Sequence, residues 1–125
     1  MNDGGVSATG PSLTNFLVNG PFRPQEFNML TYIALSNFTD QGIKDVKSTT
    51  KRSDAVKEIA KKFGAKMTQI YWTQGKYDVV AVIEAPDEAS ATAFALAIGM
   101  SGNVRTHTLR AFSSEEMNGI LGKLG

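Results

Sequence analysis

Hydrophobic and polar positions follow a regular pattern from about residue 29 onward. Two segments place apolar side chains at i, i+3, i+4 and i+7, the spacing of one helical face: residues 56–63 and 91–98. Four short segments rich in β-branched and aromatic side chains are typical of strands: residues 29–36, 66–73, 77–85 and 103–112. The pattern therefore predicts the order strand, helix, strand, strand, helix, strand.

Turn and capping residues mark the ends of these elements. Gly64 is placed to end the first helix as the residue that follows its C-cap. Asp87 is placed to cap the second helix, because a side-chain carboxylate there can accept a backbone N–H. Between the second and third strands, Gly75 lies in a three-residue turn, so these two strands should form a hairpin.

Two further amphipathic segments accompany this core pattern. After helix-start signals at residues 37–40, Ile43 and Val46 begin an amphipathic stretch that leads into the first helix. Beyond the fourth strand, Ser113 and Glu116 have the spacing of a capping box. The terminal helix that follows would line one face with Met117, Ile120, Leu121 and Leu124.

This order of elements predicts an α+β fold, the ferredoxin-like β-α-β-β-α-β antiparallel sheet, with an extra C-terminal helix. In that arrangement the first and third strands are central, and the second and fourth lie at the edges. The sequence agrees, since residues 29–36 and 77–85 are apolar on both faces while residues 103–112 are more polar.

Helices on one side of such a sheet leave its second face uncovered. A central strand with apolar residues on both faces needs a second cover, which the N-terminal segment, the terminal helix or the sheet of another subunit could supply. We favour a second subunit, because large exposed apolar sheet faces mark interfaces. The candidate interface residues are Ile33, Val79, Ala81 and Ile83.

The length of 125 residues fits a single folded domain. Residues 1–27 form a glycine- and proline-rich N-terminal extension, a composition that cannot easily bury enough apolar surface to order itself. The folded domain is expected over residues 28–125.

Composition removes several classes of chemistry. The chain has no cysteine and one histidine, so disulfides, thiolate metal sites and multi-histidine metal sites are excluded. We expect no metal and no cofactor. The net charge of +1 favours neither nucleic acid nor membrane as a partner, and with no signal peptide pattern the expected location is cytoplasmic.

Candidate ligand-binding residues gather on the strands and at the hairpin. Arg105 and His107 are two residues apart on one strand and therefore share a face, where they could bind an anion or supply a base. The alternative is an edge-strand pair that faces solvent or an interface. The aromatic and acidic candidates, which could equally serve packing and turn geometry, are Tyr32, Tyr71, Tyr77 and Asp78.

Three segments are similar to the GYD-domain family of small bacterial proteins. They are residues 31–42 (TYIALSNFTDQG), residues 70–87 (IYWTQGKYDVVAVIEAPD) and residues 102–112 (GNVRTHTLRAF). Gly75, Tyr77 and Asp78 match the residues that give the family its name. The resemblance covers about residues 29–124, so the first 28 residues fall outside it.

The resemblance implies a dimeric α/β barrel built from ferredoxin-like subunits, in a family without an established activity. His107 has no typical counterpart at its position in that family, which argues against a family-wide role for it. We expect a homo-oligomeric small-ligand-binding or regulatory module without catalytic activity, with itself and a small apolar ligand as partners.

The competing hypothesis is a cofactor-independent dimeric-barrel enzyme, oxygenase-like or isomerase-like, that acts on a small aromatic or carbonyl compound. Its closed interior would orient the substrate near Tyr32, Tyr71, Asp78, Arg105 and His107. An enzyme predicts a cavity with convergent polar groups, whereas a binding module predicts a packed seam with Arg105 and His107 outside it.

Overall fold

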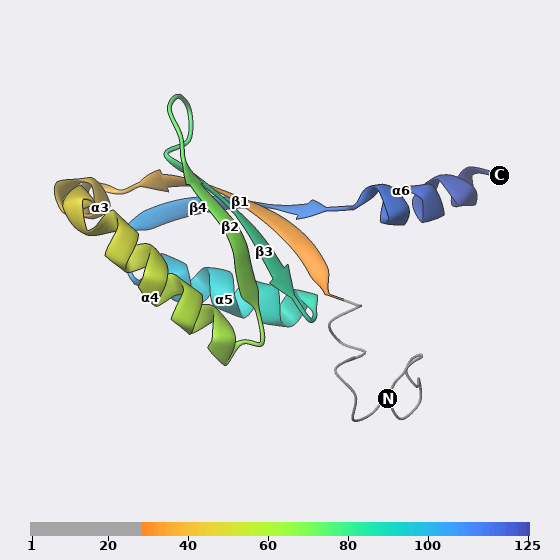
Figure 1. The fold of residues 1–125 in the computed structure, drawn as a ribbon, viewed down its shortest axis with the longest axis horizontal. Helices are drawn as coiled ribbons and strands as arrows, with labels where there is room; N and C mark the ends of the chain where they lie inside the picture. Colours follow the sequence, from red (N-terminus) through yellow and green to blue (C-terminus); the bar gives the residue numbers. More distant parts are fainter. Residues whose placement is uncertain (1–28) are drawn as a thin grey trace.

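A computed structural model describes residues 29–125 as one four-stranded antiparallel sheet with helices on one face (Figure 1). The strand order is β2-β3-β1-β4, with the first and third strands at the centre. The strands are β1 (Leu30–Phe38), β2 (Lys66–Trp72), β3 (Val79–Ala85) and β4 (Val104–Ala111). This order confirms the predicted ferredoxin-like α+β fold. The predicted extension, residues 1–27, lies outside the described residues.

The first long helix ends, and the second begins, where the sequence signals predict. These helices are α4 (Thr49–Lys62) and α5 (Glu88–Met100). Gly64 follows α4 with φ of 69°, a left-handed conformation that favours glycine. The carboxylate of Asp87 accepts the backbone N–H of Ser90 at 2.7 Å and caps α5. Both helices lie on the same side of the sheet (Figure 1).

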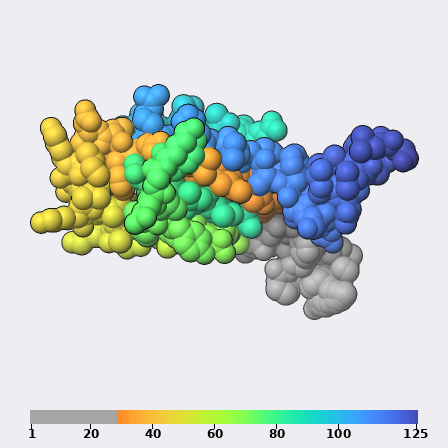
Figure 2. Space-filling view, turned by 90° about the horizontal axis from the view of Figure 1, so that it is seen from above, coloured from red at the N-terminus to blue at the C-terminus, as the bar shows by residue number. Residues whose placement is uncertain are grey.

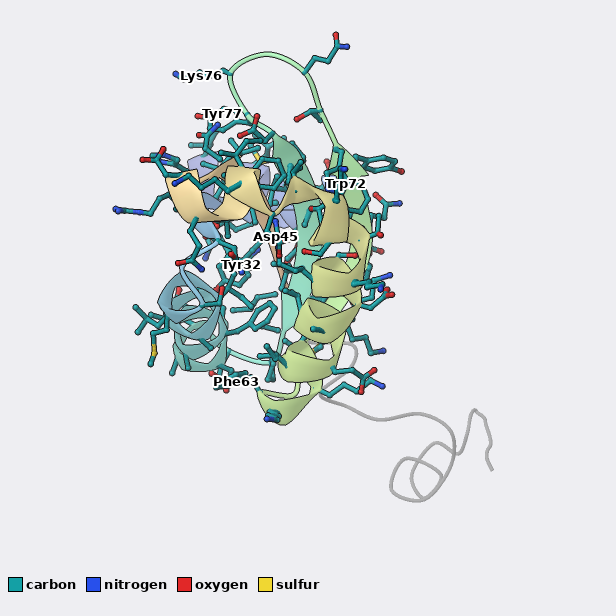
Figure 3. All side chains as sticks on the ribbon, turned by 90° about the vertical axis from the view of Figure 1, so that its left-hand side faces the viewer. Tyr32, Asp45, Phe63, Trp72, Lys76 and Tyr77 are labelled. Carbon is teal, nitrogen blue, oxygen red and sulfur yellow. The ribbon has the colours of Figure 1, made fainter. Side chains whose placement is uncertain are left out.

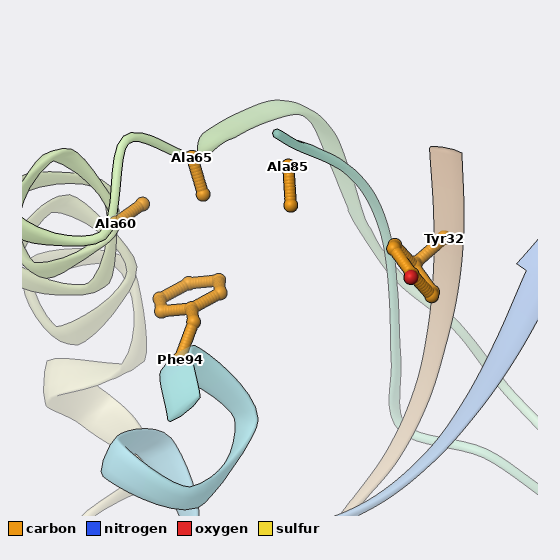
Figure 4. Packing of buried hydrophobic residues seen from close by; sticks show 5 residues of the cluster. All are labelled: Tyr32, Ala60, Ala65, Ala85 and Phe94. Carbon is orange, nitrogen blue, oxygen red and sulfur yellow. The ribbon is translucent and has the colours of Figure 1, made fainter. Parts of the chain in front are cut away.

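A small hydrophobic core joins these helices to one end of the sheet. Phe94 of α5 is almost fully buried, and its ring centroid lies 6.2 Å from that of Phe63 at the end of α4. Figure 4 shows the buried cluster, in which the other members are Tyr32, Ala60, Ala65 and Ala85. Three of the five clustered residues are alanine, so the rings of Tyr32 and Phe94 supply most of the side-chain volume of the cluster.

The segment between β1 and α4 differs from the predicted amphipathic stretch. It forms two short helices, α3 (Asp40–Lys44) and η1 (Val46–Ser48). Ile43 is 52% exposed and Val46 37% exposed, so neither continues the buried face of α4. The reason is a corner held by Arg52, whose guanidinium donates to the carbonyl oxygens of Gly42 and Asp45.

The two faces of the sheet differ in what covers them. Paired residues across β1 and β3, such as Ala34 with Ala81 and Ser36 with Val79, lie toward the helices. The alternate positions form the other face, which we call the open face. Its aliphatic residues are Ile33, Leu35, Val80, Val82 and Leu109.

This placement corrects part of the predicted interface. Of the four candidates, Ile33 lies on the open face. Val79, Ala81 and Ile83 instead line the space between the sheet and the helices. Their neighbours Val80 and Val82 take the open side of β3, because successive side chains of a strand point to opposite faces.

The C-terminal helix α6 (Ser114–Leu121) extends away from the end of the sheet, continued by η2 (Gly122–Leu124) (Figure 1). Ser113 and Glu116 form the predicted capping box, with both reciprocal hydrogen bonds present. Figure 2 shows the same projection from above, in dark blue at one end of the molecule. α6 therefore does not cover the open face, which removes one of the three predicted covers.

Candidate functional site

The hairpin motif links the start of β3 to the end of β1. Gly75 has φ of 102° in the turn, the left-handed region where glycine is favoured. The carboxylate of Asp78 accepts the backbone N–H of Phe38 at 2.9 Å, and the backbone N–H of Asp78 donates to the carbonyl of Ser36 at 2.9 Å. The side chain of Asp78 thus holds the loop against β1, rather than projecting as a free acid.

Tyr77 and His107 meet at the edge of the open face. Their ring centroids are 6.0 Å apart, and the rings are tilted by 67° in an edge-to-face contact. The ammonium of Lys76 lies 5.8 Å from the centroid of Tyr77. Arg105 is exposed two residues before His107, opposite Asn37 of β1. These side chains can bind an aromatic or anionic group at the end of the open face.

One row of residues crosses the open face from edge to edge. Tyr71 of β2 pairs with Val80, Val80 with Leu35, and Leu35 with His107 of β4. Tyr71 is 59% exposed, so the phenol ring stands out from the sheet. The open face is therefore an apolar centre flanked by a tyrosine on one edge and a histidine on the other.

Tyr32 does not belong to this group, although the sequence analysis placed it there. It is buried on the helix side of the sheet, as Figure 3 shows, and its ring lies 5.7 Å from the guanidinium carbon of Arg110. Opposite faces of the sheet therefore separate it from the other five candidates, which are Tyr71, Tyr77, Asp78, Arg105 and His107. A single site built from all six is excluded in one copy of the chain.

A cavity of about 130 Å³ lies between the helix side of the sheet and helices α4 and α5. This cavity was not predicted from the sequence. The available signal was the row of small side chains at the centre of the covered face, where Ala34 lies opposite both Ala81 and Thr108. Such small residues leave space that larger aliphatic side chains usually fill.

Two carboxylates have shifted pKa values, and both cap helices. Hydrogen bonding from Ser90, chiefly its backbone N–H, holds the pKa of Asp87 below its ordinary value. The backbone N–H of Ser113 does the same for the pKa of Glu116, with a smaller contribution from Arg110. The cause in each case is a helix N-terminus, so these shifts indicate capping roles.

Residues 29–125 contain neither a membrane-spanning helix nor a cluster of metal-binding side chains. None of the helices in this part of the chain has the length and apolar character needed to cross a bilayer. Within the same residues, no three side chains of histidine, aspartate or glutamate come together as a group that could hold a metal ion.

Comparison with known proteins identifies relatives in sequence. The family model of the GYD domain matches residues 32–121. A curated protein of Thermus thermophilus, named "Glutamine synthetase and cystathionine beta-lyase binding protein", is 36% identical over 84 residues. That alignment covers 66% of this chain and 88% of the relative.

Two solved structures resemble the chain. MtbAldR superposes with a TM-score of 0.55 at 11% identity over 69% of this chain, and the chain spans 55% of its length. TTHA0845 of Thermus thermophilus gives a TM-score of 0.45 at 23% identity, covering 69% of this chain and 96% of that protein. The likeness to MtbAldR concerns the fold alone. Because the family model covers most of the described residues, the chain belongs to the GYD-domain family.

Proposed function

We propose that this chain is a homo-oligomeric binding or regulatory module without catalytic activity of its own, which pairs through the open face. The observation that carries the proposal is the apolar centre of that face. Ile33, Leu35, Val80 and Val82 lie side by side on the two central strands, with Leu109 beside them on β4. Leu109 is 49% exposed in the single copy.

The physical argument is the free energy of burying this surface. Apolar surface that leaves water contributes about 25 cal/mol per Å², and contiguous apolar patches on sheet faces mark interaction sites. A second copy is the occupant that we propose, because its own open face carries the same unsatisfied surface. Two such sheets packed face to face would enclose the apolar rows and leave Arg105 and Lys76 at the rim.

Binding of other proteins is the regulatory part of the proposal. The relative from Thermus thermophilus carries the name of a protein that binds two enzymes, and its alignment with this chain covers 88% of its length. A self-paired core would leave the helix layer and the projecting α6 available for such partners. Asp78 supports a non-catalytic role, since its carboxylate is engaged by the backbone of Phe38.

One observation favours the competing enzyme hypothesis. Tyr77 and His107 are in ring contact at the edge of the open face, so pairing could bring a phenol and an imidazole from each copy toward a shared interior. The enzyme hypothesis therefore predicts that His107→Gln abolishes turnover of a small aromatic or carbonyl compound. The module hypothesis predicts no such turnover in the wild type, so that His107→Gln changes nothing in the same assay.

Light scattering on the full chain tests the pairing. Val82→Lys places a charge at the centre of the open face and should convert the dimer to a monomer that still melts cooperatively. The matched control is Leu96→Lys on α5, where the leucine is already 64% exposed, and this variant should stay dimeric. A wild-type chain that is monomeric at high concentration, or a Val82→Lys variant that remains dimeric, would contradict the proposal.

A further inference from the structure

The cavity between the sheet and the helix layer has the features of a small ligand site. Its volume is about 130 Å³, and most of the surface that lines it is carbon. The exposed Thr106 and Thr108 of edge strand β4 form one wall, so the cavity opens to solvent beside β4. Figure 3 looks into the same layer, where Tyr32 lies between the sheet and the two helices.

Small side chains on both the sheet and the helices leave this space open. On the sheet, Ala34 is directly opposite Ala81, and both are positions where β-branched or larger aliphatic residues are usual in a covered strand. Thr108 lies opposite Ala34 on its other side. The helices add Ser53 from α4 and Ala95 from α5. Five small side chains from five elements therefore converge on one volume, and larger residues such as Phe94 and Trp72 lie around it.

The size of the cavity defines the size of the ligand. A cavity of about 150 Å³ with an apolar lining accommodates a benzene ring in another protein. The cavity of about 130 Å³ here is slightly smaller and partly open, so a single six-membered ring fits while a fused polycyclic system does not.

The polar groups in the wall define its chemistry. The hydroxyls of Ser36 and Thr106 are 2.8 Å apart and share one hydrogen bond. Because each hydroxyl carries one donor, one O–H remains after that bond and can donate to a ligand oxygen. The charged group in the lining, the guanidinium of Arg52, already donates to Asp45, Ser48 and Gly42. A neutral ligand is therefore favoured over an anion.

We infer that this cavity binds a neutral single-ring aromatic molecule with one hydroxyl or carbonyl substituent. The ring would lie over Ala34 and Ala81, and the substituent would reach the Ser36–Thr106 hydroxyl pair at the β4 wall. The site lies within one copy, on the face opposite the proposed pairing surface. The ligand proposal and the pairing proposal can therefore fail separately, because light scattering reports pairing and does not report ligand binding.

Trp72 supplies an internal reporter. It is the one tryptophan of the chain, it lines the cavity, and its indole N–H donates to the Thr49 hydroxyl at 3.0 Å. A ring bound against this side chain should change its fluorescence in proportion to occupancy.

The test is titration of the full chain with phenol, followed by calorimetry and by Trp72 fluorescence. We expect saturable binding with one site per chain. Ala34→Leu fills the floor of the cavity and should weaken phenol binding at least tenfold. Ala89→Leu, the same substitution at an exposed position of α5 outside the cavity lining, should leave the affinity within twofold.

Two further variants keep the inference testable. If Ala34→Leu does not melt cooperatively, Ala95→Leu fills the cavity from the helix side and carries the same expectation. Ser36→Ala combined with Thr106→Val removes both hydroxyls and should weaken phenol binding several-fold while leaving benzene binding unchanged. The inference fails if wild type shows no saturable phenol binding, if both filled variants bind as wild type does, or if the variant without the two hydroxyls affects benzene and phenol equally.

Discussion

The carboxylate of Asp78 accepts the backbone N–H of Phe38 at 2.9 Å, which fastens the start of β3 to the last residue of β1. A charge-assisted hydrogen bond of this kind contributes about 1.5–3 kcal/mol. Asp78→Ala should lower the free energy of unfolding by about that amount, because the Phe38 N–H loses its acceptor in a half-buried position. Urea denaturation of the full chain measures the change.

Asp54→Ala is the matched control for Asp78→Ala. Asp54 is exposed on the outer surface of α4, so its loss should change stability by less than about 0.5 kcal/mol. Equal stability of the Asp78→Ala variant and wild type would show that the carboxylate serves something other than the fold.

Much of this fold could be predicted from the sequence, and the exception is which side chains of β3 face the helices. The strand order follows from the element order, and the caps at Asp87 and Ser113 follow from local chemistry. The orientation of β3 does not follow from its first five residues, because all five are apolar and carry no alternation. Glu84 is the one polar residue in that strand, and its pairing with Lys66 and Thr31 marks the open face. Counting back from Glu84 assigns Val82 and Val80 to the same face.

The sequence predicts which side chains of the candidate site share a face, but it does not predict which residues from different elements meet. Arg105 and His107 share a face because they are two residues apart on one strand. Tyr77 reaches His107 only because the loop at Asp78 turns its ring over the edge of the sheet, and no local pattern encodes that turn. The cavity depends on small residues from five elements, so it becomes visible only once the register pairs Ala34 with Ala81.

The projecting helix α6 should be stable only when something packs on it. Its eight residues are below the length at which isolated helices persist in water, and its apolar residues Met117 and Leu121 are 43% and 48% exposed. In the monomeric Val82→Lys variant, we expect the amides of α6 to exchange with solvent at nearly unfolded rates. The amides of β1 and β3 should stay protected, and hydrogen exchange followed by mass spectrometry distinguishes the two. Slow exchange of α6 in that monomer would contradict the expectation.

The Asp87 cap of α5 should make the stability of the fold depend on pH. The hydrogen bonds from Ser90 hold the pKa of Asp87 below its ordinary value of 3.8 in the folded chain. The charged carboxylate therefore stabilises the fold above the unfolded pKa, and this contribution is lost as the pH falls through the folded pKa. Asp87→Asn keeps a capping side chain and removes the charge. It should lower the Tm at neutral pH, and the difference from wild type should close in acid.

Salt provides the control for the Asp87 measurement. The carboxylate is solvent-exposed, so its interaction with the helix N-terminus should weaken as ionic strength rises. Asp54→Asn, in the middle of α4, should show no comparable pH-dependent difference. A Tm difference for Asp87→Asn that persists in strong acid would assign the effect to the shape of the side chain.

The unfilled cavity should lower the free energy of unfolding, and a larger side chain that fills it should raise that free energy. The apolar side chains that line the cavity lack packing partners on that side. Ala95→Leu adds three carbons from the α5 side and should raise the free energy of unfolding by about 1–2 kcal/mol, since each buried methylene contributes about 0.8 kcal/mol. Ala89→Leu, at an exposed position of the same helix, should give no gain. If Ala95→Leu has a higher free energy of unfolding than wild type and no longer binds phenol, then Ala95 keeps the binding cavity open at the expense of stability. A less stable Ala95→Leu variant would show that the space does not accept a leucine side chain.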